Sequence, residues 1–496
     1  MNALIASRTM TAQEAAELIH HGDVIGASGF TPSGYPKVIP GALAERAIRC
    51  HEAGQPFQVA LYTGASTGDE LDGVLARAKA LSRRLPYQSN PDVRAGINAG
   101  EIEFTDMHLS HVGQMVRWGF LAKPTVALVE AVDVTDDGRI YLSASGGASA
   151  SYLQTAERIL IELNSFYGHG LKGYHDVYIP EDMPNRQTIP LLHTGDRIGT
   201  DYVQVDPSRI KAIVATNLAD RTAVFREPDQ DSKTIAAHIL AFLKREKQLG
   251  RLHGDQPYQS GVGNVANAVL GSMAADPSQP PVSVYTEVMQ DSVVELLLHD
   301  KLVVASGAAM TLSPACQTQW KANIDAWREK FIIRQMEISN SPGLARRLGI
   351  IAMNTALELD IFGNVNSTHV MGTKMMNGIG GSGDFTRNSF LPIFMTPSTA
   401  KGGAISSIVP MVTHVDHTEH DTMVFVTEQG LADVRGMGPE RRAREIIEKC
   451  AHPDYRPLLM DYLEAGLRSG SRHTPVLLSR AFEFHNRFLE TGSMQY

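Results

Sequence analysis

Residues 259–287 read QSGVGNVANAVLGSMAADPSQPPVSVYTE, and this stretch decides the fold class. A Gly-rich turn at residues 261–263 leads into a helical pattern at residues 264–275, and an apolar run follows at residues 282–286. Short strands that alternate with helices are typical of βαβ units, whose strands pair in parallel. The stretch therefore predicts a turn, a helix and a buried strand that ends at Glu287.

The same alternation extends in both directions. Apolar runs of strand length lie at residues 23–28, 58–63, 125–132, 159–163, 210–216, 405–412 and 422–427. Helical patterns lie at residues 12–20, 38–51, 232–246, 439–450 and 455–465. We therefore predict an α/β fold with two similar open, mostly parallel sheets flanked by helices.

A polar, proline-bearing stretch, Arg226-Glu227-Pro228-Asp229-Gln230-Asp231, is typical of a linker. The chain has 496 residues, which is long enough for more than one domain. We predict an N-terminal α/β domain over residues 1–228 and a C-terminal α/β domain over residues 229–496. The C-terminal domain would carry Glu287 and the Gly-rich loops.

Composition excludes several classes of protein. The net charge of −9 offers no basic surface for nucleic acid or an anionic membrane. No uncharged apolar run reaches the roughly 18 residues of a membrane-spanning helix, and the N-terminus lacks a signal pattern. The three cysteines, Cys50, Cys316 and Cys450, are far apart and form no CxxC motif, which is typical of reduced thiols in a cytoplasmic protein.

Two glutamates follow predicted strands in the same way. Glu287 and Glu428 each come directly after a Thr that ends an apolar run. Ligands of open α/β sheets bind at the carboxyl ends of the strands, although an ordinary surface acid also fits this position. Two carboxylates that share a pocket raise each other's pKa, unless a neutral donor such as the amide of Asn340 holds them. Asn340 precedes Pro342 and could equally be a turn residue.

Gly-rich segments allow the backbone to approach a ligand closely. The turn at residues 261–263 can direct amides at a phosphate or an oxyanion. It also fits the GxGxxA fingerprint of nicotinamide-binding proteins, with Glu287 roughly 20 residues further on. That match is weak because residues 253–258 are polar and interrupted by proline where the fingerprint needs a strand.

A second Gly-rich loop lies at residues 376–385. Lys401, beside Gly402 and Gly403, could bind a pyrophosphate or a thioester group, although a lysine on the surface is more often simply solvated.

Residues 413–420 contain His414, His417 and His420. Their spacing fits neither HExxH nor a zinc finger. If the segment continued a strand, alternate side chains would face opposite ways and scatter the ligands. We therefore predict no metal site.

Five motifs occur in order: Gln259-Ser260-Gly261-Val262-Gly263-Asn264, Tyr285-Thr286-Glu287-Val288, Glu337-Ile338-Ser339-Asn340, Asn377-Gly378-Ile379-Gly380-Gly381-Ser382-Gly383-Asp384-Phe385 and Thr427-Glu428-Gln429-Gly430. Together they resemble the acetyl-CoA hydrolase/transferase family of class I CoA-transferases, most of all its bacterial succinyl-CoA:acetate and propionyl-CoA:succinate enzymes. The resemblance covers nearly the whole chain, including Ser28-Gly29-Phe30-Thr31-Pro32 and Thr491-Gly492-Ser493-Met494.

The resemblance implies roles for individual residues. Glu287 would be the nucleophile, with Asn340 and Glu428 packed around it. Gly381 and an amide of the 261–263 turn would hold the thioester oxygen. The implied CoA-contacting residues are Gln259, Ser260, Gly261, Val262, Gly263, Asn377, Gly381 and Lys401. The resemblance also implies a homodimer.

The resemblance further implies an enzyme that transfers CoA between a short acyl-CoA (succinyl-, acetyl- or propionyl-CoA) and a free carboxylate (acetate, succinate or propionate). The reaction would be ping-pong through a glutamyl-CoA thioester, with CoA as substrate and no permanently bound cofactor. Three alternatives stay open at this point: an acyl-CoA hydrolase with the same site, a nicotinamide-dependent oxidoreductase, and a non-catalytic CoA-binding protein. The presence of both Glu287 and Glu428 argues against the last, because a binding protein needs neither.

Overall fold

The computed structural model describes residues 2–222, 228–469 and 472–495, so Arg226 and Glu227 of the predicted linker lie outside the described residues. Contacts group the chain into two compact units. Unit 1 comprises Met1–Val224, Ser283–Leu297 and Leu302–Leu344, and unit 2 comprises Phe225–Val282, Leu298–Lys301 and Ala345–Tyr496. This grouping assigns Glu287 to unit 1. The division into domains 1–228 and 229–496 stays a prediction.

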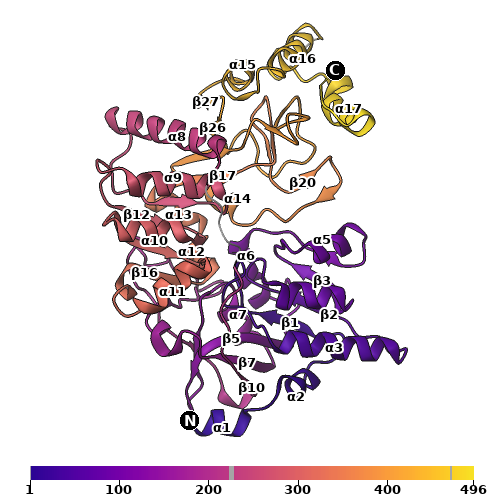
Figure 1. Cartoon of the computed structure of the whole chain (residues 1–496), viewed down its shortest axis with the longest axis vertical. Helices are drawn as coiled ribbons and strands as arrows, with labels where there is room; N and C mark the ends of the chain where they lie inside the picture. Colours follow the sequence, from indigo (N-terminus) through magenta and orange to yellow (C-terminus); the bar gives the residue numbers. More distant parts are fainter. Residues whose placement is uncertain (1, 223–227, 470–471, 496) are drawn as a thin grey trace. The chain divides into compact units, whose positions relative to one another are not determined.

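A mostly parallel sheet forms the N-terminal part of unit 1 (Figure 1). The strands follow the order β10 (Ile210–Thr216), β7 (Arg158–Asn164), β5 (Val126–Val134), β1 (Val24–Ala27), β2 (Val59–Tyr62), β3 (Leu81–Leu85) and β4 (Glu103–Phe104). All these neighbours pair in parallel, as a βαβ pattern requires. Two antiparallel strands, β6 (Arg139–Leu142) and β9 (Val203–Gln204), extend from β5.

Helices cover both faces of this sheet because successive strand residues point in opposite directions. Val126 and Leu128 of β5 pack with α2 (Ala12–Glu17), α3 (Ile39–Glu52), α4 (Val74–Arg77) and α5 (Pro91–Asn98). Ala127 and Val129 pack in a second core with α1 (Ala3–Arg8), α6 (Leu109–Arg117) and α7 (Ser149–Thr155). The short π-helical segment η1 (Asp69–Gly73) precedes α4.

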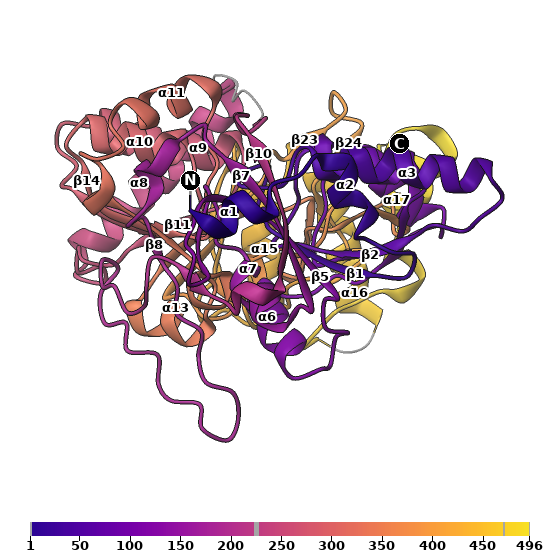
Figure 2. The same ribbon diagram turned by 90° about the horizontal axis from the view of Figure 1, so that it is seen from below.

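The rest of unit 1 contains a second group of strands. Its order is β12 (Val282–Tyr285), β14 (Leu302–Gly307), β16 (Phe331–Arg334) and β8 (His175–Asp176). The short strands β13 (Val288–Met289) and β15 (Ala309–Met310) pair in parallel. The helices here are α10 (Asp291–Leu298), α11 (Pro314–Ala322), α12 (Met336–Ser339) and α13 (Pro342–Leu348), and the 3-10 turns are η2 (Gly168–Leu171), η3 (Pro207–Arg209) and η4 (Arg328–Lys330). Figure 2 shows the connection between β8 and β9 as a long loop with little regular structure.

Unit 2 has its own mostly parallel strands. The order is β27 (Gly430–Asp433), β26 (Val424–Thr427), β22 (Leu391–Met395), β17 (Ile351–Thr355) and β11 (Tyr258–Ser260), and only β27 is antiparallel. Helices α8 (Gln230–Gln248) and α9 (Asn264–Ala275) pack together beside these strands. A separate apolar core joins strands β22, β26 and β27 to α15 (Pro439–Cys450), α16 (Arg456–Ser469) and α17 (Glu483–Thr491).

The remaining elements of unit 2 are short. They are β18 (Glu358–Asp360), β19 (Val365–Asn366), β20 (His369–Val370), β21 (Lys374–Met375), β23 (Thr399–Ala400), β24 (Ile405–Ser406), β25 (Ile408–Val409), α14 (Ser382–Thr386) and the 3-10 turn η5 (Leu478–Arg480). No helix among the described residues is long and apolar enough to cross a bilayer.

The predicted α/β class, with mostly parallel sheets flanked by helices, is confirmed. The expected strand over residues 405–412 is wrong. The Ser406 hydroxyl donates to Ile408 O (2.7 Å) and accepts from Ile408 N (3.2 Å), so the chain bends between β24 and β25. The strand β11 was not predicted, because Gln259 and Ser260 are polar; three residues leave little periodicity to detect.

Candidate active site

Glu287 lies in the short turn between β12 and β13. The backbone around it is fixed on both sides. Thr286 N donates to Ser306 O (2.9 Å), and Ala308 N donates to Glu287 O (2.8 Å). Thr286 is fully buried whereas Glu287 is partly exposed. The segment thus presents the carboxylate from a rigid strand end, a precondition for an accurately aligned nucleophile.

The amide of Asn340 contacts this carboxylate directly. Asn340 Nδ2 donates to Glu287 Oε2 at 3.0 Å. Ser339 Oγ donates to Asn340 Oδ1 at 2.7 Å, which selects the amide orientation in which the nitrogen faces Glu287. Asn340 is completely buried and ends α12. The sequence-based pairing of this carboxylate with a neutral amide donor is thus present in the structure.

Three contacts hold α12 in place. Tyr285 OH, on β12, donates to Ile338 O at 2.6 Å. Glu337 pairs with Arg117 (2.8 Å) and with Arg186 (2.7 Å). These ion pairs tie α12 to α6 and to the long loop seen in Figure 2. Sequence reasoning did not find Arg117 or Arg186, because neither lies in a motif. The acid Glu337, within the motif that ends at Asn340, was the only available signal.

Glu428 directly follows β26 in unit 2. Its carboxylate accepts hydrogen bonds from Ser398 N (2.8 Å), from the Ser398 hydroxyl and from Gln429 Nε2 (3.0 Å). Burial alone would raise the pKa of Glu428, but these donors outweigh it and hold the pKa below its ordinary value. The charge of Glu428 is therefore well stabilised. Ser398 leads directly into the segment that carries Lys401.

The Gly-rich turn after β11 begins α9. Gly261 N donates to Met353 O (2.8 Å), so this amide belongs to the β11–β17 pairing. Gly263 has φ 136°, a conformation that favours glycine, and forms the N-cap of α9. The amides of Val262 and Gly263, at the positive end of α9, are therefore the better candidates for an oxyanion contact. Gln259 is buried, and its amide exchanges hydrogen bonds with Asn354 at 3.3 and 3.2 Å. Ser260 is also buried.

The second Gly-rich loop contains Asn377 and Gly381 and leads into α14. Gly378 and Gly380 have φ values of 153° and 60°, which accounts for glycine at both positions. Ser382 Oγ donates to Ile379 O (2.8 Å) and lies 3.0 Å from His417 Nε2. The buried His417 therefore supports this loop.

The other histidines of residues 413–420 have separate surroundings. His414 lies against the ring of His369, with 4.0 Å between centroids, and its Nε2 is 3.3 Å from Asp416. The His420 side chain is 82% exposed. The described residues contain no group of three or more His, Cys, Asp or Glu side chains able to hold a metal.

Lys401 occupies the turn between β23 and β24 and is exposed. Its Nζ lies 4.9 Å from the ring centroid of Phe488 on α17. Two backbone carbonyls of the turn accept hydrogen bonds from residues outside it. Met494 N donates to Ala404 O (2.8 Å), and Tyr455 OH donates to Gly403 O (2.7 Å). The Thr491–Met494 motif at the C-terminus thus supports the segment that carries Lys401.

The predicted site residues therefore fall into two sets. Glu287 and Asn340 belong to unit 1 and contact each other. The set in unit 2 comprises Gln259, Ser260, Gly261, Val262, Gly263, Asn377, Gly381, Lys401 and Glu428. Sequence reasoning did not assign roles to Tyr285, Ser339 or Ser398, although all three lie within or beside the motifs.

Two domains of a known protein family match the chain. Residues 6–215 match the acetyl-CoA hydrolase/transferase N-terminal domain, and residues 318–463 match the acetyl-CoA hydrolase/transferase C-terminal domain. The chain is 47% identical to the succinyl-CoA:acetate CoA-transferase of Clostridium kluyveri, over 100% of this chain and 91% of that protein. It is 46% identical to the propanoyl-CoA:succinate CoA transferase of Escherichia coli, over 98% of both.

Other relatives are named as hydrolases and not as transferases. The acetyl-CoA hydrolase of Schizosaccharomyces pombe is 40% identical, over 100% of this chain and 99% of that protein. Among solved structures, RipA from Yersinia pestis has the same fold, with a TM-score of 0.70 at 20% identity over 92% of this chain and 97% of RipA. These matches extend over the whole chain, and both family regions are present. The chain is therefore an enzyme that belongs to the acetyl-CoA hydrolase/transferase family.

Proposed function

We propose that this enzyme transfers CoA between a short acyl-CoA and a free carboxylate, with Glu287 as the covalent nucleophile. The observation that carries the proposal is the contact between Glu287 and the buried amide of Asn340, on a strand end fixed by backbone hydrogen bonds. A carboxylate needs alignment of this kind to attack a thioester. The names of the two bacterial relatives support succinyl-, acetyl- and propionyl-CoA as the acyl donors.

The first half-reaction loads CoA onto the enzyme. A Glu287 oxygen attacks the acyl carbon of the thioester, and the C–S bond breaks to release CoA thiolate and leave an acyl–glutamyl anhydride. The thiolate then attacks the glutamyl carbonyl, and the original acid leaves as its carboxylate. The enzyme now carries a Glu287–CoA thioester, which conserves the energy of the substrate thioester.

The second half-reaction reverses these bonds with a different acid. The incoming carboxylate attacks the glutamyl thioester, which regenerates CoA thiolate and an anhydride. The thiolate attacks the acyl carbon of the anhydride, and this step releases the new acyl-CoA and free Glu287. The enzyme returns to its starting state, and no proton or electron is gained or lost overall.

Each attack places negative charge on a carbonyl oxygen. Preorganised amide donors stabilise such an oxyanion, and loss of one donor typically costs about 3–4 kcal/mol. The proposed donors are Gly381 and an amide of the 261–263 turn, for which Val262 and Gly263 are favoured because Gly261 N already donates to Met353 O. Asn377 and Lys401 are proposed to contact CoA, Glu428 to act near the nucleophile, and the enzyme to act as a homodimer.

A second candidate function is acyl-CoA hydrolysis at the same site. It is favoured by the name of the Schizosaccharomyces pombe relative, acetyl-CoA hydrolase. Water would take the place of the incoming carboxylate and would release CoA irreversibly. The two functions therefore differ only in what attacks the loaded enzyme.

The deciding experiment incubates the enzyme with succinyl-CoA or acetyl-CoA and no acceptor, then seeks CoA on the peptide that contains Glu287 by mass spectrometry. Transfer predicts an adduct that disappears on addition of acetate or succinate as a new acyl-CoA forms. Free CoA that appears at the same rate with and without acceptor would favour hydrolysis. Turnover with an adduct on another residue would overturn the role of Glu287.

A further inference from the structure

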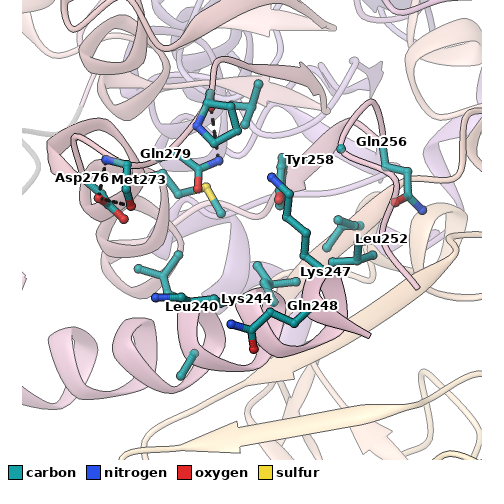
Figure 3. A pocket seen from close by; sticks show the side chains of 17 residues that line it. Leu240, Lys244, Lys247, Gln248, Leu252, Gln256, Tyr258, Met273, Asp276 and Gln279 are labelled. Atoms are coloured by element: carbon teal, nitrogen blue, oxygen red, sulfur yellow. Dashed lines mark hydrogen bonds between the residues drawn. The ribbon is translucent and has the colours of Figure 1, made fainter. Parts of the chain in front are cut away.

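Unit 2 contains a pocket that the proposed reaction does not use (Figure 3). Its volume is about 510 Å³, within the range of small-molecule sites. It lies between α8, the C-terminal end of α9 and the strands β11 and β17. All the lining residues belong to unit 2.

The pocket lies at the opposite edge of these strands from the Gly-rich turn. Tyr258 and Ile351, which line it, are the first residues of β11 and β17 and pair with each other. The Gly261–Gly263 turn follows the last residue of β11. Because β11 and β17 are parallel, their amino ends share the edge that holds the pocket. A ligand there would leave the turn accessible.

The floor of the pocket is aliphatic. The apolar side chains that line it are mostly buried and comprise Leu240, Leu243, Leu252, Met273, Val282 and Ile351. Tyr258 supplies the one aromatic ring among the lining residues. A flexible hydrocarbon chain fits such a lining better than a flat base, which needs a stacking partner. Burial of each methylene of such a chain strengthens binding through the hydrophobic effect.

Apart from Asp276, the polar side chains of the pocket are cationic or neutral. Lys244 and Lys247 lie three residues apart on α8 and therefore share one face of the helix. Figure 3 shows Lys247 extending from α8 across the pocket toward Tyr258. Within the described part of the chain, Lys247 forms no ion pair and the Tyr258 hydroxyl has no hydrogen-bond partner.

The one acidic side chain among the lining residues, Asp276, already accepts hydrogen bonds from a neighbouring residue. Asp276 accepts hydrogen bonds from the backbone N and the hydroxyl of Ser278, both at 2.8 Å. Gln256 Oε1 accepts from His253 N at 3.0 Å. The groups left to recognise a ligand thus include the Lys247 ammonium, the Tyr258 hydroxyl, the Gln248 amide and the aliphatic floor.

We propose that this pocket binds a medium-chain carboxylate, with the anionic head at Lys247 and Tyr258 and the chain on the aliphatic floor. An ammonium group and a hydroxyl donor match a carboxylate, and the floor matches a hydrocarbon chain. This site goes beyond the proposed transfer reaction and does not rest on it.

The test is isothermal titration calorimetry of the full-length enzyme with decanoate below its micelle concentration. We expect saturable binding by the wild type and about two- to tenfold weaker binding by Lys244→Gln/Lys247→Gln, as for the loss of two exposed charge pairs. Tyr258→Phe keeps the ring and should weaken binding severalfold. Lys233→Gln is the matched control, because Lys233 is an exposed lysine on α8 outside the pocket.

A second probe, 1-decanol, has the same chain without the charge and should bind more weakly than decanoate. Circular dichroism melting of each variant checks that the fold is intact. The proposal is overturned if the double lysine variant binds decanoate as tightly as the wild type. It is equally overturned if 1-decanol matches decanoate, or if the wild type gives no saturable binding.

Discussion

Glu287 and Glu428 share a local sequence but not an environment. Each directly follows a Thr that ends a strand run, β12 or β26. Glu287 accepts a hydrogen bond from the amide of Asn340, which Ser339 orients. Glu428 accepts from the backbone and the hydroxyl of Ser398 and from Gln429, and its pKa is lowered.

The difference shows that a strand-end carboxylate acquires its character from its partners. Donors that lower a carboxylate's pKa stabilise its charge, and they also reduce its nucleophilicity. We therefore propose an electrostatic role for Glu428 near the nucleophile. The neutral, buried amide at Glu287 orients the carboxylate from a helix end that is itself fixed by ion pairs.

The largest expected effect comes from exchanging the nucleophile. Glu287→Gln should reduce acyl transfer about a thousandfold or more, because the amide cannot form the anhydride. Glu287→Asp keeps the charge but retracts it by one methylene, and should cost at least about a hundredfold. Initial rates with succinyl-CoA and acetate measure both effects.

Glu428→Gln provides the matched control in the mass-spectrometric search for the CoA adduct. It should still accumulate the CoA adduct on the peptide that contains Glu287. An adduct that is lost in Glu428→Gln and retained in Glu287→Gln would reverse the assignment of the two glutamates.

The next effect concerns Asn340. Asn340→Asp preserves the shape of the side chain but places a second acid 3.0 Å from Glu287 Oε2. The added charge disfavours the ionised nucleophile, so transfer should fall about ten- to a hundredfold and its pH optimum should move upward. A pH–rate profile separates this result from simple loss of fold, which would lower the rate equally at every pH.

The smallest effect is expected at Ser398. Ser398→Ala removes one donor to Glu428 and should destabilise the protein at pH 7 by about 1 kcal/mol. The folded-state pKa of Glu428 is lowered from an ordinary 4.5, so the stabilisation is present above pH 4.5 and is lost as the pH falls through the folded-state value. Urea unfolding at pH 7 and pH 3 should therefore show a destabilisation that shrinks at the lower pH. An equal effect at both values would contradict the role of Ser398.

Much of the fold follows from local patterns. The helices over residues 264–275 and 439–450 and the strand over 210–216 lie where periodicity predicts them. A capping box of Thr11 and Glu14 begins α2, as expected from local residue types. Short strands escaped prediction, as β11 shows, because backbone pairing with β17 can outweigh an unfavourable composition.

The order of the motifs along the chain determined the family, the fold class and the identity of the candidate nucleophile. These properties depend on residue type and spacing, which the sequence states directly. Only the tertiary structure decided which partners Glu428 has, that Gly261 N already donates to Met353 O and that His417 supports a Gly-rich loop. Such contacts join residues that are distant along the chain, for example Arg117 and Glu337, so local periodicity carries no information about them.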